Sequence, residues 1–162
     1  MTGVQTCAFP IWHLIGHLQR NKARAAVQFG MVHGMDSERL AEALNAAASA
    51  AGVVLEVLLQ ANVSGEGTKS GVVPGDVPAL AARLAELRGL RVVGAMTMAP
   101  FDAPESVLRD VFRGARQVRE QLAQAGHPAS YLSMGMSGDY EIAVEEGATH
   151  VRLGTVLFGS RT

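Results

Sequence analysis

The stretch VVLEVLLQANV, residues 53–63, is the most strand-like segment of the chain. It is rich in Val and Leu, and β-branched residues such as Val favour an extended backbone. Helical patterns lie on either side of it, over residues 37–51 and 77–87. We therefore predict that this segment is a strand between two helices, as in β-α-β units.

Strand and helix patterns alternate in the same way along the rest of the chain. The predicted strands are 12–16, 31–33, 53–63, 91–98, 131–133 and 151–154. The predicted helices are 19–28, 37–51, 77–87, 105–125 and 139–146. Asp36 is the expected N-cap of the second helix, and Gly52 is its expected C-terminal stop. This alternation predicts parallel strands joined by crossover helices.

The chain is expected to form one α/β domain, because its 162 residues contain no repeat, linker or low-complexity tract. Two architectures fit six parallel strands. One is an open, doubly wound sheet. The other is a TIM-type (β/α)8 barrel, which normally takes about 250 residues and eight strands. Six strands are two short of such a barrel, so the pattern alone leaves both open.

The composition is that of an ordinary globular protein, with 48% hydrophobic and 18% charged residues and a net charge of −1. No basic cluster stands out, so we expect no nucleic-acid partner. No window approaches the roughly 20 apolar residues of a membrane helix. A single cysteine, Cys7, and the lack of a signal-peptide pattern favour a reducing, cytoplasmic location.

Small residues and hydroxyls follow the last two predicted strands. They are SMGMSGD at 133–139 and RLGT at 152–155. Ligands of parallel α/β folds bind at the carboxyl ends of the strands, and backbone amides beside glycine suit an anion. The two segments together therefore predict a phosphate site. The alternative is that they are plain turns, with Ser137 or Asp139 capping the following helix.

Arg152 lies in the last strand-like run, between Val151 and Leu153. If its apolar neighbours face outward, the guanidinium points into the fold. If they face inward, Arg152 is a surface residue of an edge strand. The pattern leaves both orientations open.

The histidines predict no metal site. His13 and His17 are four residues apart but straddle a predicted strand-to-helix junction, so they would not share a helical face. His33, His127 and His150 are single and scattered in the sequence. No nucleophile motif such as G-x-S-x-G is present either.

Five blocks carry a resemblance to a known family. They are WHLIGHLQRNK (12–22), TKSG (68–71), GAMTMAP (94–100), SMGMSGD (133–139) and VRLGTVLFG (151–159). In this order and spacing they resemble the pyridoxal phosphate homeostasis protein family, which is similar in fold to the barrel domain of bacterial alanine racemase. The resemblance implies a PLP-binding barrel of the (β/α)8 kind over residues 12–162, with about six of its eight strands present.

The resemblance also implies a ligand, pyridoxal 5′-phosphate (PLP), and residues that bind it. Those expected at the phosphate are Ser133, Gly135, Ser137, Gly154 and Thr155. Arg152 is expected near the pyridine nitrogen or the phosphate rim. Met96 and Met134 are expected as walls around the ring, or alternatively as core methionines. The implied function is a non-catalytic intracellular PLP carrier, monomeric in its full-length form.

The lysine that would hold the aldehyde as a Schiff base is not matched in this chain. Its only lysines are Lys22 and Lys69, and neither falls in the family's Schiff-base segment. We therefore expect an N-terminally truncated member with unpaired strand edges and low stability, which binds PLP weakly or not at all. Residues 1–11 match nothing in the family and are set apart. Lys69 is either a second aldehyde site or a solvated surface lysine.

Two other functions remain open from the sequence. One is a PLP enzyme of the racemase type, which needs a Schiff-base lysine and a second acid–base residue. The other is a different phosphate-ligand α/β barrel enzyme. Its acid–base groups would have to come from the loop carboxylates Glu66, Asp102 and Asp139.

Overall fold

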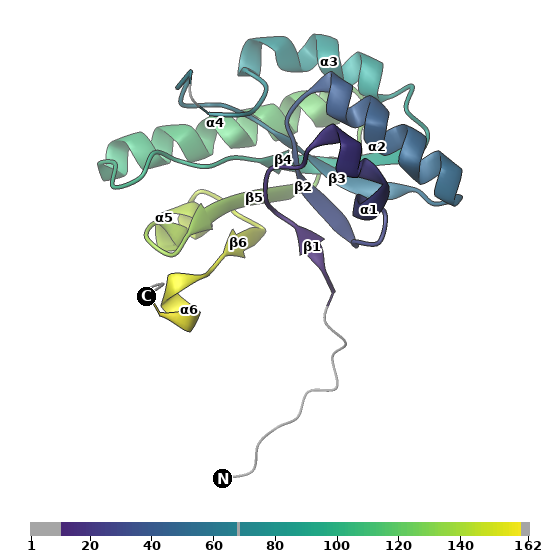
Figure 1. The fold of residues 1–162 in the computed structure, drawn as a ribbon. Coiled ribbons are helices and arrows are strands. Elements are labelled where there is room, and N and C mark those ends of the chain that lie inside the picture. Colours follow the sequence, from purple (N-terminus) through teal and green to yellow (C-terminus); the bar gives the residue numbers. More distant parts are fainter. Residues whose placement is uncertain (1–10, 68, 160–162) are drawn as a thin grey trace.

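The computed structural model describes residues 11–67 and 69–159, and these residues form one six-stranded parallel sheet (Figure 1). The strands are β1 (His13–Leu14), β2 (Met31–Met35), β3 (Leu55–Gln60), β4 (Leu90–Met96), β5 (Tyr131–Met136) and β6 (His150–Arg152). Their order in the sheet follows their order in the chain. A doubly wound sheet reverses its strand order at a switch point, so the sequential order excludes that architecture and fits a barrel.

The helices follow the strands in the predicted alternation. They are α1 (Ala23–Ala26), α2 (Glu38–Ala51), α3 (Val77–Leu84), α4 (Glu105–Gln124), α5 (Tyr140–Glu145) and α6 (Thr155–Phe158). Two 3-10 turns, Arg20–Lys22 and Pro74–Asp76, precede α1 and α3. Figure 1 shows α2, α3 and α4 together on one face of the sheet.

Two predicted boundaries are wrong in ways that bear on the site. The N-cap of α2 is Ser37 rather than Asp36, because the Ser37 hydroxyl accepts a hydrogen bond from the Leu40 amide at 3.4 Å. The fifth strand continues to Met136 instead of stopping at Ser133. The expected stop at Gly52 is confirmed, since this residue ends α2 in the left-handed conformation with φ of 69°.

The sheet separates two groups of buried side chains. The larger core lies between the sheet and the helices, with Phe112 of α4 and Leu132 of β5 both fully buried in it. A smaller cluster on the other face contains only strand residues, which are Met31, Leu58, Val93, Met96 and the partly buried Tyr131. No helix contributes to that second cluster, so this face is the lumen of the barrel.

The sheet is strongly curved. His13 belongs to the first strand and His150 to the last, yet their ring centroids are only 6.1 Å apart across the lumen. Each of these two edge strands pairs with a single neighbour within the described residues. The fold is therefore an incomplete (β/α)8-type barrel with six strands, as predicted. Among the described helices, none is long and apolar enough to cross a membrane.

Candidate functional site

Polar side chains from strands distant in the sheet meet inside the lumen. Ser133 of β5 and His33 of β2 form a buried hydrogen bond of 2.8 Å between Oγ and Nδ1. The other ring nitrogen of His33, Nε2, lies 3.0 Å from Nδ1 of His13 in β1. The curvature of the sheet makes these contacts possible, because β2 and β5 are not neighbours in it.

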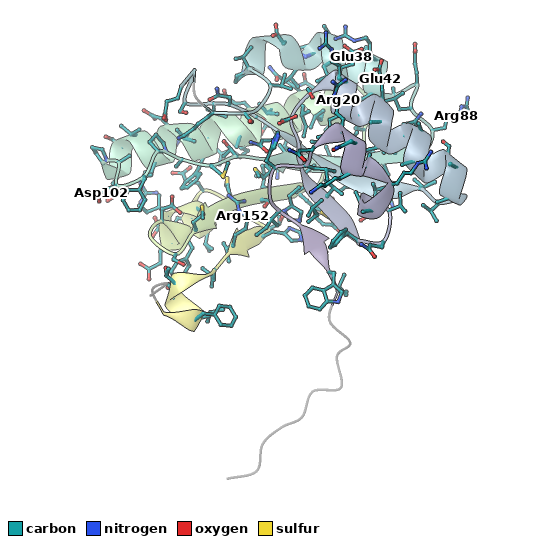
Figure 2. All side chains as sticks on the ribbon, viewed as in Figure 1. Arg20, Glu38, Glu42, Arg88, Asp102 and Arg152 are labelled. Atoms are coloured by element: carbon teal, nitrogen blue, oxygen red, sulfur yellow. The ribbon has the colours of Figure 1, made fainter. Side chains whose placement is uncertain are left out.

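Arg152 extends this polar cluster to β6. Its Nη1 donates to Ser133 Oγ at 2.7 Å, and its Nη2 donates to the carbonyl of Thr97, just after β4, at 2.9 Å. Figure 2 shows Arg152 near the middle of the molecule, whereas the labelled Arg88 and Asp102 lie at the periphery. Of its two predicted orientations, the structure therefore shows the inward one. A guanidinium has five N–H donors, so donors remain for a ligand.

Three histidines lie close together in the lumen, so the prediction that His33 and His150 are single histidines is wrong. The rings of His13, His33 and His150 have centroids 5.1 to 6.1 Å apart. The Tyr131 ring lies 5.0 Å from that of His150. The sequence separates these residues by up to 137 positions, and only the closing curvature brings them together. In the part of the chain that the structure describes, no group of three or more His, Cys, Asp or Glu side chains is arranged so that it could hold a metal ion.

Burial keeps the central histidine neutral. His33 is only 2% exposed. Desolvation lowers its pKa from 6.5 to about 3, and the neighbouring His13, His150 and Arg152 act in the same direction because each adds positive charge. Burial likewise lowers the pKa of His150, with a contribution from His13. The lumen thus favours the neutral forms of His33 and His150 beside one guanidinium.

The corner after β5 is held tightly against α5. Gly135 has φ of 91°, and a Cβ built there would lie 2.6 Å from the Cβ of Ala143. The side chain of Asp139 turns back, and its Oδ1 accepts from the Met136 amide at 2.6 Å. Asp139 occupies the N-cap position of α5 but its side chain makes no capping bond. Gly135 therefore serves close packing, and Asp139 closes the turn.

Ser137 joins the two predicted phosphate segments. Its Oγ accepts from the Gly154 amide at 3.1 Å and from the Val156 amide at 3.4 Å. The two corners are therefore adjacent, as a shared phosphate site requires. Ser137 caps the turn that follows β6 rather than the helix after its own strand. The amide of Gly138 has no acceptor within the described residues.

Two of the three loop carboxylates, Glu66 and Asp139, are engaged in local structure. Glu66 pairs with Lys69 at 2.7 Å, and this hydrogen bond lowers the pKa of Glu66. Asn62 fixes the same loop by donating to the carbonyls of both residues. Asp139 closes the turn between β5 and α5 by accepting from the Met136 amide. These roles leave Glu66 and Asp139 poorly placed as acid–base groups, and they leave the Lys69 amine paired.

The model of the family "Alanine racemase, N-terminal domain" matches residues 5–162 of the chain. The chain belongs to this family. The match includes residues 5–11, so the expectation that residues 1–11 match nothing in the family is wrong for this part. The domain boundary expected between residues 11 and 12 stays a prediction, and residues 1–10 lie outside the described part of the structure.

Named relatives of this family member are pyridoxal phosphate homeostasis proteins. The one from Aquifex aeolicus is 42% identical over 153 residues, which cover 93% of this chain and 67% of that protein. The one from Pseudomonas aeruginosa is 43% identical over 151 residues, covering 93% of this chain and 64% of that protein. The chain thus spans about two thirds of the length of these curated relatives.

Solved structures agree with the fold of this family member. PipY of Synechococcus elongatus without PLP has a TM-score of 0.86 and 40% identity, covering 91% of this chain and 70% of that one. The PLP-bound form of PipY has a TM-score of 0.82 and 39% identity, with the same coverage of the two chains. Alanine racemase of Clostridium difficile has a TM-score of 0.78 at 16% identity, covering 97% of this chain and 41% of that one. This likeness supports the barrel fold alone.

The two methionines predicted beside the ring lie on opposite faces of the sheet. Met96 belongs to the lumen cluster with Leu58 and Val93. Met134 is fully buried in the core on the helix side. Successive strand residues point to opposite faces, and Met134 follows the lumen-facing Ser133. Met134 is therefore a core methionine, which was the alternative, and its predicted role as a ring wall does not fit its position.

Three residues of the polar cluster were not predicted as site residues, namely His13, His33 and Thr97. His33 was read as an isolated histidine and Thr97 as part of a strand end. The missed signal is alternation: His33 is two residues from the lumen-facing Met31, so both share a face of β2.

Proposed function

We propose that this chain binds pyridoxal 5′-phosphate at the carboxyl ends of β5 and β6 and acts as a non-catalytic carrier. One observation carries this proposal. Ser137 joins the two predicted phosphate-binding segments, 133–139 and 152–155, beside the inward-pointing Arg152. The homeostasis proteins it resembles and the PLP-bound PipY support the choice of ligand.

The residues fit the parts of this ligand in different ways. The amides of Gly138 and of Thr155, at the first position of α6, suit phosphate oxygens because they have no acceptor of their own in the described structure. The first amides of a helix lack an intrahelical partner. The guanidinium of Arg152 suits the pyridine nitrogen or the phosphate rim. Arg152 beside that nitrogen would keep it unprotonated and so weaken the electron-sink chemistry of the cofactor.

Several features favour a carrier over an enzyme. The loop carboxylates Glu66 and Asp139 are engaged in local structure, and Lys69 is paired with Glu66. We further propose a cytoplasmic location, no nucleic-acid partner and a monomeric full-length form. Conversion of L-alanine to D-alanine by the PLP-loaded chain would favour the racemase-type alternative instead.

The predicted phosphate corner is tested by Ser137→Ala. This change removes the hydroxyl that orders the Gly154 and Val156 amides, so we expect PLP affinity to fall about 10-fold, the worth of one good hydrogen bond to a charged group. Titration calorimetry with PLP and with pyridoxal, which lacks the phosphate, measures this. Pyridoxal should bind more weakly than PLP and should respond little to the substitution.

Ser130→Ala is the matched control, because Ser130 is exposed just before β5 and its side chain makes no hydrogen bond in the described structure. Its affinity for PLP should equal that of the unmodified chain. Equal binding of PLP and pyridoxal, together with an unchanged affinity in Ser137→Ala, would contradict a phosphate site at this corner.

A further inference from the structure

We propose that His33 is a positioning residue: through Ser133 it holds the Arg152 guanidinium at the mouth of the lumen, oriented toward the ligand. This inference rests on the proposed PLP site and names a residue that supports it without touching the ligand. It follows from three polar contacts that run without a break from Arg152 to His13.

The donors and acceptors of this chain of contacts can be assigned by counting protons. Ser133 Oγ accepts from Arg152 Nη1 at 2.7 Å and has one proton to give. The acceptor in reach is His33 Nδ1, at 2.8 Å. A neutral His33 then carries its proton on Nε2 and donates to His13 Nδ1 at 3.0 Å. Every bond points the same way, so each polarises the next.

The arrangement also resists an alternative position of Arg152. The carboxylate of Asp139 is near enough to raise the pKa of Arg152, against the lowering effect of burial. Asp139 therefore attracts the guanidinium toward the corner after β5. Ser133 and the Thr97 carbonyl hold it in the lumen instead. Ser133 is fully buried and His33 is 2% exposed, so neither can exchange its partner for bulk water.

The charged and titratable groups that face His33 come from two strands. His13 approaches from β1, and His150 and Arg152 approach from β6. None of them is acidic. A protonated His33 would have no counter-charge in the lumen, and its Nδ1 could no longer accept the Ser133 proton.

Two substitutions test the roles of the two ring nitrogens of His33 one at a time. The amide of Asn occupies the place of Nδ1 and the amide of Gln that of Nε2. His33→Asn should therefore keep the bond to Ser133, while His33→Gln should keep only the bond to His13. The readout is the set of Arg152 guanidinium signals in the 15N–1H spectrum of the chain without PLP. These signals are assigned as the ones that disappear in Arg152→Lys. His127→Gln, a change at a half-buried histidine that faces the Ala81 carbonyl, is the control.

We expect slowly exchanging Arg152 guanidinium signals in the unmodified chain, in His33→Asn and in the control, and their loss in His33→Gln. PLP affinity should fall about 10-fold in His33→Gln and stay within about threefold in His33→Asn. If His33→Gln and His33→Asn behave alike, His33 only fills space and the inference is overturned.

Two safeguards keep the result interpretable. Should His33→Gln fail to fold, Ser133→Ala takes its place, since it removes only a hydroxyl; retained guanidinium signals there would also overturn the inference. If no form of the chain binds PLP, the proposed function fails, and the guanidinium signals still decide the role of His33.

Discussion

Replacing Gly94 by alanine should destabilise the fold by about 3 kcal/mol or more, because two strands meet there with no room for a methyl group. Gly94 in β4 pairs with Tyr131 in β5. A Cβ at this position would lie 2.0 Å from the Tyr131 carbonyl oxygen and 2.7 Å from its carbonyl carbon. Backbone atoms cannot turn aside as a flexible side chain can, so the ladder between β4 and β5 would have to open.

The same change should abolish PLP binding, because the β4–β5 ladder aligns the site. Two residues beyond Gly94, Met96 pairs with Ser133. The amide of Thr97 donates to the Ser133 carbonyl at 3.1 Å. Separating these strands would move the Thr97 carbonyl away from Ser133 and remove one of the two anchors of Arg152.

Chemical denaturation followed by circular dichroism measures the stability loss, and Gly75→Ala is the control. Gly75 lies in the 3-10 turn before α3, and a Cβ there would meet nothing within 4 Å. Its free energy of unfolding should change by no more than about 0.5 kcal/mol. A Gly94→Ala chain as stable as the control would show that β4 and β5 do not approach as closely as described.

Most of the fold could be predicted from the sequence, because strand and helix patterns depend on local residues. The stretch at 53–63 contains β3, and the helix expected over 105–125 matches α4 nearly end to end. The first helix was less predictable. Its expected span of 19–28 divides into a 3-10 turn, Arg20–Lys22, and the short α1. Nothing local in that segment marks where one helix type gives way to the other.

The site was predictable only in its outer part. Ser137 and Gly154 follow strands and carry hydroxyl and glycine chemistry, so their sequence context points to the corner. The inner part depends on the curvature of the sheet, which brings His33 of β2 to within 2.8 Å of Ser133 in β5. No spacing along the chain encodes that contact, because it joins residues 100 positions apart across the lumen.

Strand length also decided which residues face the site. Because β5 continues to Met136, Ser133 and Met134 lie inside the strand and alternate between its faces. A loop in their place would have allowed both to face the ligand. The longer strand therefore separates the two residues, assigning Ser133 to the lumen and Met134 to the core.

The stability of the chain should fall as the pH is lowered from 7 to 5, by about 2 kcal/mol from His33 alone. The pKa of His33 is about 3 in the folded chain and 6.5 for an unperturbed histidine. Between these values the unfolded chain binds a proton that the folded chain does not. Stability is therefore unaffected by this group above pH 6.5 and decreases as the pH falls toward 3. His150, whose pKa is also lowered, adds a change of the same sign.

Urea unfolding at pH 7 and at pH 5 measures this loss, and His33→Asn should remove most of it because Asn does not titrate. The carboxylates Glu66 and Glu146 have pKa values lowered below 4.5 by their basic partners, so they contribute mainly below pH 5. His127→Gln, which alters a histidine outside the lumen, should keep the full acid dependence. The same loss in His33→Asn as in the unmodified chain would mean that His33 is not held neutral, and the assignment of His33 Nδ1 as the acceptor of the Ser133 proton would be wrong.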